Sequence, residues 1–421
     1  MPKRTLLRGG TVIDGLGSAA RHHTSLLTEN NTIQAIGHEA DALAAADPAT
    51  EVVDVTGCTV IPGLVDMHSH LSYVPNPRGP LGINDTLSIE ANTLEAVGNA
   101  WTYLRHGFTT LLDVGTRGSI ASSVRDAVSQ GLICGPRVVA SGQVISSTGG
   151  LMNSYPSWVD VRLGNGASAD GEVEIRREVR RQSIAGVDSI KLGVTGQLGT
   201  RARDWLLLSQ GEIAVAVDEA RRRRLSVGAH AYGPEAVAAA ISGGVNIVHH
   251  AFAGLTEETI DLFARMGTFL VPTAMAFIDK PTPAGWPDAS RQYYESNLAG
   301  YISGLQQILA SDLKDQVAVG SDSGISNPTA TTAKEILLFE RLGLTSIEAI
   351  RAATHNAARA LSLDDTIGSL EVGKQADVSV VSGDVCSSLD LLLQPENFLL
   401  VIKGGRVVVD GRPKRTQGWT A

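Results

Sequence analysis

Two histidines spaced two residues apart, His68 and His70, follow an apolar run that begins at Val60. On an extended strand, side chains two positions apart lie on the same face, so both imidazoles could reach one point in space. Imidazole is the commonest metal ligand near neutral pH. The pair is equally compatible with two partly exposed histidines at a strand end, because two residues do not make a metal site.

Other residues of metal-ligand type stand at the ends of further apolar runs. They are Lys191, His230, His249, His250 and Asp322. If these runs are parallel strands of one barrel, their carboxyl ends converge on a single mouth. Their shared position at strand ends favours one joint site over five separate structural roles.

Lys191 lies inside an otherwise apolar run, where a bare ammonium is costly to bury and is repelled by a divalent cation. One reading is a lysine that is paired with a nearby acid. The alternative is chemical, because a neutral lysine can take up carbon dioxide and become a carbamate. A carbamate is an anionic group whose two oxygen atoms can bridge two cations.

The apolar runs alternate with longer helical patterns, which is typical of parallel βα units. We expect eight strands, at residues 60–67, 109–114, 137–141, 189–192, 226–230, 246–250, 268–272 and 316–321. Eight strands over roughly 300 residues predict an α/β fold, a (β/α)8 TIM barrel, whose active sites lie at the carboxyl ends of the strands.

Short strand patterns separated by Gly, Asn and Asp precede and follow the barrel region. Neither end of the chain is long enough to fold well alone. We therefore predict a small composite β-domain, a β-sandwich built from residues 1–57 plus 362–421. The barrel would then occupy residues 58–361.

Composition excludes some classes of partner. The chain has 421 residues, with 35 Lys+Arg against 44 Asp+Glu, so nothing attracts it globally to nucleic acid or anionic membranes. The basic run Arg221–Arg224 is predicted to be a solvated helix end rather than a polyanion site. Three widely spaced cysteines fit a reducing compartment, and no apolar run approaches the ~20 residues of a membrane span. We expect a cytoplasmic homo-oligomer with a small-molecule substrate.

Five segments carry a shared family pattern: Ile61–His70, Ile190–Lys191, Gly228–His230, Gly320–Gly324 and Ile367–Asp377. Through these segments the chain resembles the amidohydrolase superfamily of metal-dependent hydrolases over nearly its full length. Residues Gly135–Gly142 and Ser146–Gly150 place the resemblance nearest the prolidase-like and imidazolonepropionase-related branch. The mononuclear deaminases of the superfamily lack the strand-four lysine, so Lys191 favours hydrolysis at a two-metal centre.

The resemblance implies six ligands to two divalent metal ions, for which zinc is the expected metal. They are His68, His70, Lys191, His230, His250 and Asp322. The histidines of strand one would hold the more buried ion and those of strands five and six the second, with the carboxylated lysine bridging both. A bridging hydroxide would attack the substrate, while Asp322 takes up its proton and delivers it to the leaving nitrogen or oxygen.

Two adjacent histidines end the sixth strand, His249 and His250, whereas family members usually carry one, commonly after an acidic residue. Alignment on the small residue that follows selects His250 as the ligand. Neighbouring residues of a strand point to opposite faces, so we expect His249 to point away from the site. Whether His249 has a role there stays open.

Four further residues are candidate substrate contacts: Tyr232, Leu151, Asn153 and Arg201. Leu151 and Asn153 occupy a segment in which the family often carries a substrate-facing histidine, so the chain departs from a simple dipeptidase. Our leading hypothesis is hydrolysis of an amide bond in an N-acyl amino acid or an Xaa-Pro-type dipeptide. The alternatives are a hydrolase of a cyclic amide, carbamate, lactone or xenobiotic ester, and a non-catalytic binding protein on the same scaffold.

Overall fold

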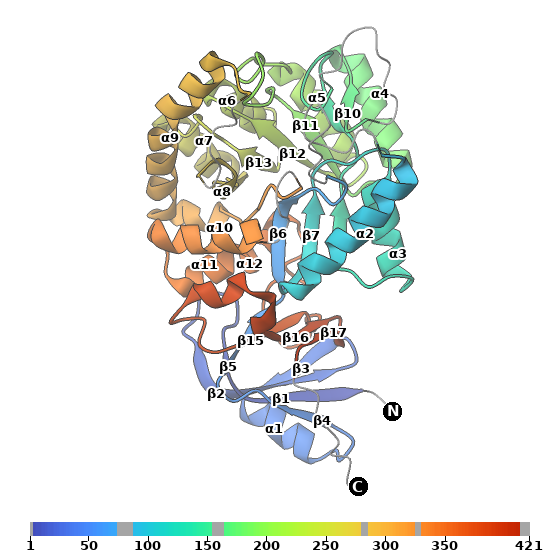
Figure 1. The fold of residues 1–421 in the computed structure, drawn as a ribbon, viewed down its shortest axis with the longest axis vertical. Coiled ribbons are helices and arrows are strands. Elements are labelled where there is room, and N and C mark those ends of the chain that lie inside the picture. Colours follow the sequence, from blue (N-terminus) through green and yellow to red (C-terminus); the bar gives the residue numbers. More distant parts are fainter. Residues whose placement is uncertain (1–2, 74–86, 154–163, 279–284, 325–329, 413–421) are drawn as a thin grey trace.

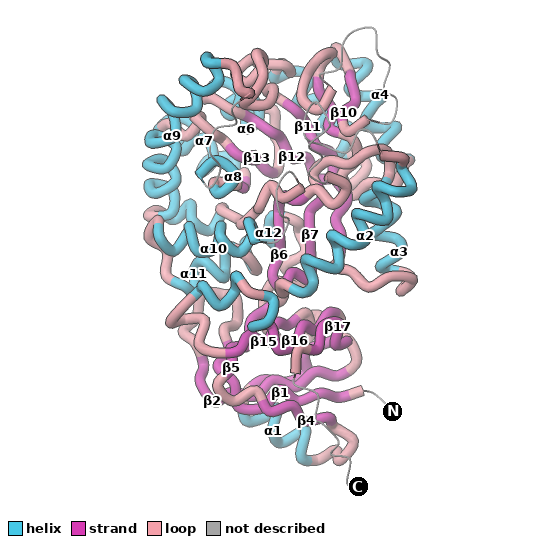
Figure 2. Tube along the Cα trace, viewed as in Figure 1, coloured by secondary structure: helices cyan, strands magenta, loops and turns pink. Residues whose placement is uncertain are grey.

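The computed structural model describes residues 3–73, 87–153, 164–278, 285–324 and 330–412. Strands from both ends of the chain form one body, and a larger α/β body lies against it (Figure 1). In the larger body, strands run through the middle and helices cover the outside (Figure 2).

The larger body has strands separated by helices, with a run of consecutive strands after residue 137 and a run of consecutive helices after residue 275. The strands are β6 (Leu64–Ser69), β7 (Phe108–Asp113), β8 (Arg137–Ala140), β9 (Val144–Ser146), β10 (Gly166–Ser168), β11 (Ser189–Gly193), β12 (Ser226–Ala231), β13 (Ile247–His250) and β14 (Phe269–Val271). The helices are α2 (Ile89–Arg105), α3 (Ile120–Ser129), α4 (Gly171–Ile184), α5 (Gln210–Arg221), α6 (Pro234–Ser242), α7 (Glu257–Met266), α8 (Met275–Ile278), α9 (Asp288–Leu309), η1 (Asp312–Gln316), α10 (Ala330–Arg341), α11 (Ser346–Ala352) and α12 (His355–Ala360). Within the described ranges, no helix has both the length and the apolar character to cross a membrane.

The parallel strands form two sheets, β6-β7-β8 and β10-β9-β11-β12-β13-β14. Three isolated parallel bridges extend this pairing: Ser141–Ser189, Leu270–Val317 and Ser69–Ser323. Residues 317–323 therefore lie between β14 and β6, where the eighth strand was predicted. They contribute single bridges instead of a continuous ladder. The α/β fold is thus confirmed, and full closure of the barrel stays a prediction.

The first predicted strand, residues 60–67, is in fact two strands. β5 (Cys58–Pro62) pairs with strands of the terminal body, while β6 pairs with β7. Gly63 separates them at a tight approach, because a Cβ at this position would collide with the Thr109 side chain. The residues on both sides of Gly63, Val60–Pro62 and Leu64–Val65, are apolar and buried, so hydrophobicity alone could not reveal the joint.

The terminal strands form one eight-stranded sheet, in the order β17-β16-β15-β5-β1-β2-β3 with β4 paired to β1. Its remaining members are β1 (Arg4–Val12), β2 (Arg21–Glu29), β3 (Thr32–Ile36), β4 (Glu51–Asp54), β15 (Val378–Ser382), β16 (Phe398–Lys403) and β17 (Arg406–Asp410), beside helix α1 (His38–Ala45). This topology is a single sheet, so the two-layered sandwich is not confirmed. The division into domains stays a prediction.

Strand alternation decides which residues of β6 face the middle of the larger body. Val65 and Met67 are fully buried in one apolar cluster with Ala357 and Ala360 of α12. Asp66 and His68 alternate with them and point the other way, toward the inside. The apolar contacts with α12 thus orient the polar residues of β6 inward.

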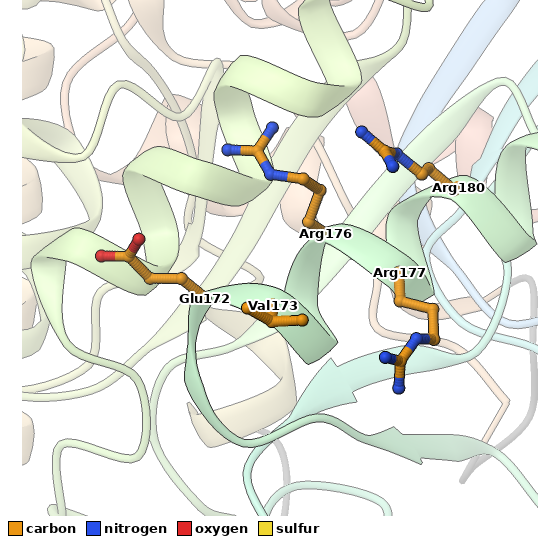
Figure 3. A pocket seen from close by; sticks show the side chains of 5 residues that line it. All are labelled: Glu172, Val173, Arg176, Arg177 and Arg180. Atoms are coloured by element: carbon orange, nitrogen blue, oxygen red, sulfur yellow. The ribbon is translucent and has the colours of Figure 1, made fainter.

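Helices α4 and α5 are joined on the outside by an arginine network around Glu219. This carboxylate is 1% exposed and accepts hydrogen bonds from Arg176 (2.7 Å) and Arg180 (2.9 Å). Figure 3 shows the residues of α4 that line the adjacent hollow: Glu172, Val173, Arg176, Arg177 and Arg180. Arg223 also pairs with Glu219, which supports the reading of Arg221–Arg224 as a helix end.

Replacing Glu219 with glutamine should lower the free energy of unfolding at neutral pH by about 1–3 kcal/mol. The pKa of Glu219 is lowered from 4.5 to about 2, and the hydrogen bond from Arg180 is the largest cause. Its stabilising contribution is therefore complete above the ordinary pKa and is lost as the pH falls toward 2. Denaturant titrations at about pH 7 and about pH 3.5 should show the smaller difference at the lower pH. The exposed neighbour Glu172→Gln is the matched control, and an equal effect at both pH values would contradict the prediction.

Candidate metal centre

His68 and His70 meet Asp322 at the carboxyl end of β6. The Nε2 atoms of the two histidines lie 3.3 Å and 3.4 Å from Asp322 Oδ1. One donor atom from each of the three residues falls within 4.8 Å of the others, a spacing that could hold a metal ion. Both histidines are buried, and the carboxylate is 19% exposed.

Each of the four candidate histidines has one ring nitrogen in a hydrogen bond with a neighbouring group. These hydrogen bonds join His68 Nδ1 to His249 Nδ1 (3.0 Å), His70 Nδ1 to Gly115 O (3.1 Å), His230 Nε2 to Gly196 O (3.2 Å) and His250 Nδ1 to Thr273 Oγ1 (2.7 Å). Such partners fix the ring orientation and the tautomer of metal-binding histidines. The second nitrogen of each ring is thereby left to serve as a ligand.

His250 reaches the centre through an unusual backbone conformation. Its φ is 72°, in the left-handed region, at the last residue of β13. Its ring centroid lies 4.7 Å from that of His68 and 4.7 Å from that of His230. Asp322 also has a positive φ, of 52°. Non-glycine residues in this region cost roughly 1–3 kcal/mol each and concentrate at functional sites.

Lys191 lines the same cavity as these four histidines and Asp322. It is 3% exposed, and its Nζ has no hydrogen-bond partner among the described residues. Burial lowers the pKa of the amine well below its ordinary value. The acid-paired reading is therefore not supported, and the neutral amine is the form that can react with carbon dioxide.

The electrostatics of the cavity suit a divalent cation. Burial, and then Lys191, lowers the pKa of His68 to about 3, and the same causes act on His230. Burial would raise the pKa of Asp322, but contacts with His68 and His70 hold it well below its ordinary value. Neutral imidazoles and an ionised carboxylate are the protonation states that bind metal. The donor set present therefore fits a metal centre.

Asp66 holds neighbouring residues of this centre in place through hydrogen bonds, a role that the sequence did not suggest. It is fully buried and accepts hydrogen bonds from His68 N (2.9 Å), Ser321 Oγ (2.6 Å) and Thr332 Oγ1 (2.9 Å). Burial raises its pKa to about 6. These bonds tie β6 to residues 317–323 and so fix Asp322 beside His68. The available signal was a carboxylate two positions before His68 on the same strand face.

His249 also faces the inside, so the expectation that it points away is wrong. It is fully buried, and its ring contacts His68. In the β12–β13 ladder, His249 pairs with His230, which puts both on one face of the sheet. His250 is the residue that leaves the strand alternation, because of its left-handed backbone.

Two of the four candidate substrate contacts line the cavity, Tyr232 and Leu151. Asn153 instead hydrogen-bonds Ser168, and Arg201 lines a separate hollow with Gly149 and Trp205. The cavity is also lined by Met152, beside Leu151, and by described residues that the sequence did not single out: Tyr73, Val114, Val144 and Gln197. Tyr73 stacks on His70 with ring centroids 4.1 Å apart. Its position three residues after His70 was the available signal.

Comparison with curated proteins gives relatives of nearly equal length. Ochratoxinase of Aspergillus niger is 26% identical over 432 residues, covering 96% of this chain and 86% of the relative. Imidazolonepropionase of Mesorhizobium japonicum is 26% identical over 421 residues, covering 89% and 90%. The predicted branch is thereby confirmed.

Solved structures show the same likeness. A Xaa-Pro dipeptidase with methionine bound in its active site superposes with a TM-score of 0.84 and 27% identity, covering 96% of this chain and 99% of that one. The crystal structure of A. niger ochratoxinase gives a TM-score of 0.86 with 25% identity, covering 97% and 96%. The model of the amidohydrolase family matches residues 59–408. The chain therefore belongs to the amidohydrolase family.

Proposed function

We propose that this protein is a binuclear metal-dependent hydrolase that cleaves the amide bond of an N-acyl amino acid or a similar peptide-like compound. The observation that carries the proposal is the buried Nζ of Lys191, which has no hydrogen-bond partner in the described part of the chain and lies in a cavity lined by four histidines and Asp322. Kinship with hydrolases of amide bonds supports it. A closed (β/α)8 barrel is the scaffold that we propose for it.

In this proposal His68 and His70 would hold one ion, His230 and His250 would hold the second, and carboxylated Lys191 would be a ligand to both. The carbamate forms when the neutral Nζ attacks carbon dioxide: a nitrogen–carbon bond forms and one nitrogen-bound proton leaves to solvent. When bound, two zinc ions would supply a water of lowered pKa and would polarise the substrate carbonyl.

Asp322 moves the proton in the proposed reaction. Its Oδ1 lies 3.3 Å and 3.4 Å from Nε2 of His68 and His70, so a water held by an ion at these nitrogens would lie next to the carboxylate. It would accept the proton that the water loses on attack at the carbonyl carbon. It would then return this proton to the leaving nitrogen as the carbon–nitrogen bond breaks, so that the leaving group departs as an amine.

The cavity wall supports an apolar substrate group. Its apolar lining residues are Tyr73, Val114, Val144, Leu151 and Met152. An acyl group of apolar character fits this wall, whereas the described lining residues include no arginine that would bind the carboxylate of the amino-acid part.

A second candidate is a hydrolase of a cyclic amide, carbamate, lactone or xenobiotic ester. The apolar wall and the likeness to an imidazolonepropionase favour it. The test is a turnover screen of the metal-reconstituted enzyme on N-acyl amino acids, Xaa-Pro dipeptides, cyclic amides, carbamates and lactones. We expect the highest kcat/KM on N-acyl amino acids with apolar acyl groups. Turnover of lactones or carbamates alone would overturn the leading proposal.

Replacing Tyr232 with phenylalanine should lower kcat/KM about 10–100-fold while leaving the bound metal unchanged. Tyr232 is 6% exposed, and its ring centroid lies 4.3 Å from that of His230, so its hydroxyl can hydrogen-bond the substrate carbonyl. Steady-state kinetics with elemental analysis of the same sample measures both quantities. Tyr294→Phe is the control, since its hydroxyl donates to Phe277 O outside the cavity lining. Equal kinetics for Tyr232→Phe and wild type would contradict the assignment.

A further inference from the structure

We propose that His249 is a positioning residue that hydrogen-bonds two ligands of the centre, His68 and carboxylated Lys191. The inference rests on the proposed function and deepens it. It concerns a residue that stands beside the ligand set without belonging to it. Its basis is the contact of His249 with His68 and the strand register. Two buried nitrogen atoms, His249 Nε2 and Lys191 Nζ, also have no hydrogen-bond partner among the described residues.

The strand register puts His249 on the same sheet face as Lys191, two strands away and two residues further along. Gly228 on β12 pairs with Lys191 on β11, and His230 on β12 pairs with His249 on β13. A Cβ on Gly228 would come within 2.6 Å of His249 Nε2. The imidazole of His249 therefore lies over Gly228 and extends toward the strand that carries Lys191. Only glycine at position 228 leaves room for this ring.

The positions of the ring protons on His68 and His249 determine which imidazole donates the hydrogen bond between them. His68 Nδ1 and His249 Nδ1 are 3.0 Å apart, so one nitrogen must donate and the other accept. His68 can offer Nε2 as a ligand only if its own proton is on Nδ1. His68 then donates to His249, and the proton of His249 must reside on Nε2.

That arrangement leaves a buried N–H donor on His249 directed toward the lysine strand. Both His249 Nε2 and Lys191 Nζ are buried and lack hydrogen-bond partners among the described residues. An ammonium on Lys191 offers donors only and could not accept this hydrogen bond. A carbamate on the same nitrogen adds two acceptor oxygens. The donor on His249 thus favours the carboxylated form of Lys191 over the charged amine.

Three variants separate the two contacts of His249. His249→Phe keeps a ring of similar size and removes both hydrogen bonds. His249→Asn keeps an acceptor near the position of Nδ1 and loses the donor toward Lys191. His249→Gln can retain a donor near the position of Nε2 and loses the acceptor toward His68. The matched control is His106→Phe, which replaces a buried histidine that bonds Thr102 O on α2.

The readouts are bound metal per chain and the carbamate signal in ¹³C NMR after equilibration with ¹³C-bicarbonate, each at matched thermal stability. We expect His249→Phe to weaken metal binding about 10–100-fold in chelator competition and to lose most of the carbamate signal. His249→Asn should lose carbamate signal while holding the first ion, and His249→Gln should do the reverse. His106→Phe should match wild type.

The outcomes also separate this inference from the proposed function. If wild type shows neither a carbamate signal nor two bound ions, the proposed function fails. If wild type shows both and His249→Phe and His249→Asn show them undiminished, the positioning role alone is overturned. Should His249→Phe fail to fold, the opposite responses of the Asn and Gln variants decide the question, and identical responses would overturn the inference.

Discussion

Replacing Lys191 with alanine should lower kcat/KM by at least about 10³-fold and reduce the bound metal from two ions per chain to one or fewer. The reason is chemical, because the carbamate on Lys191 would contribute one oxygen to each ion. Its Nζ is buried and has no hydrogen-bond partner among the described residues, so the hydrogen bond that the substitution would remove is the proposed one from His249 to the carbamate. Steady-state kinetics and elemental analysis of the same preparation measure the two effects.

A small carboxylate added to the Lys191→Ala variant should restore part of the activity, since acetate or propionate can take the place of the carbamate in the space left by the side chain. Lys314→Ala is the control, because Lys314 pairs with Glu348 outside the cavity lining and should keep full activity. Wild-type turnover by Lys191→Ala without added carboxylate would refute the bridging role.

Replacing Asp322 with asparagine should lower kcat about 10²–10⁴-fold, the range typical for loss of a general acid–base group. Asparagine keeps the shape of the side chain and a ligand oxygen but cannot take up and return the proton. The loss should depend on the leaving group. An amide whose leaving amine is weakly basic, such as a nitroanilide, needs less protonation and should lose less activity than an alkyl amide.

The comparison of the two leaving groups separates a proton-transfer role from a purely structural one. All assays are run at saturating metal, so that weakened binding of an ion does not imitate a loss of chemistry. Asp315→Asn is the control, because Asp315 pairs with Arg351 on the outside of the fold. An equal loss on both substrates would show that Asp322 holds the centre without carrying the proton.

The candidate ligand residues could be picked out because strand alternation leaves a direct signal in sequence. His68 and His70 share a strand face, and apolar neighbours such as Met67 fill the opposite face. Lys191 stood out because a charged residue inside an apolar run needs a chemical reason. The structure puts these residues around one cavity.

The remaining features depend on backbone geometry that residue type does not encode. The joint at Gly63 lies inside a continuous apolar run, and the segment at 317–323 makes bridges without a ladder. The left-handed conformation of His250 brings this residue inward beside His249, against the simple alternation rule. The substrate contacts at Asn153 and Arg201 were predicted from loops, whose paths follow from tertiary packing that a single sequence does not specify.

The most direct test of the two-metal centre is a metal titration of the chelated enzyme, with bound ions per chain and turnover of an N-acyl amino acid measured on the same samples. The metal-free protein should be inactive, and activity should rise with the second ion bound and reach its maximum at two ions per chain. Full activity without metal, or maximal activity at one ion per chain, would contradict the binuclear centre.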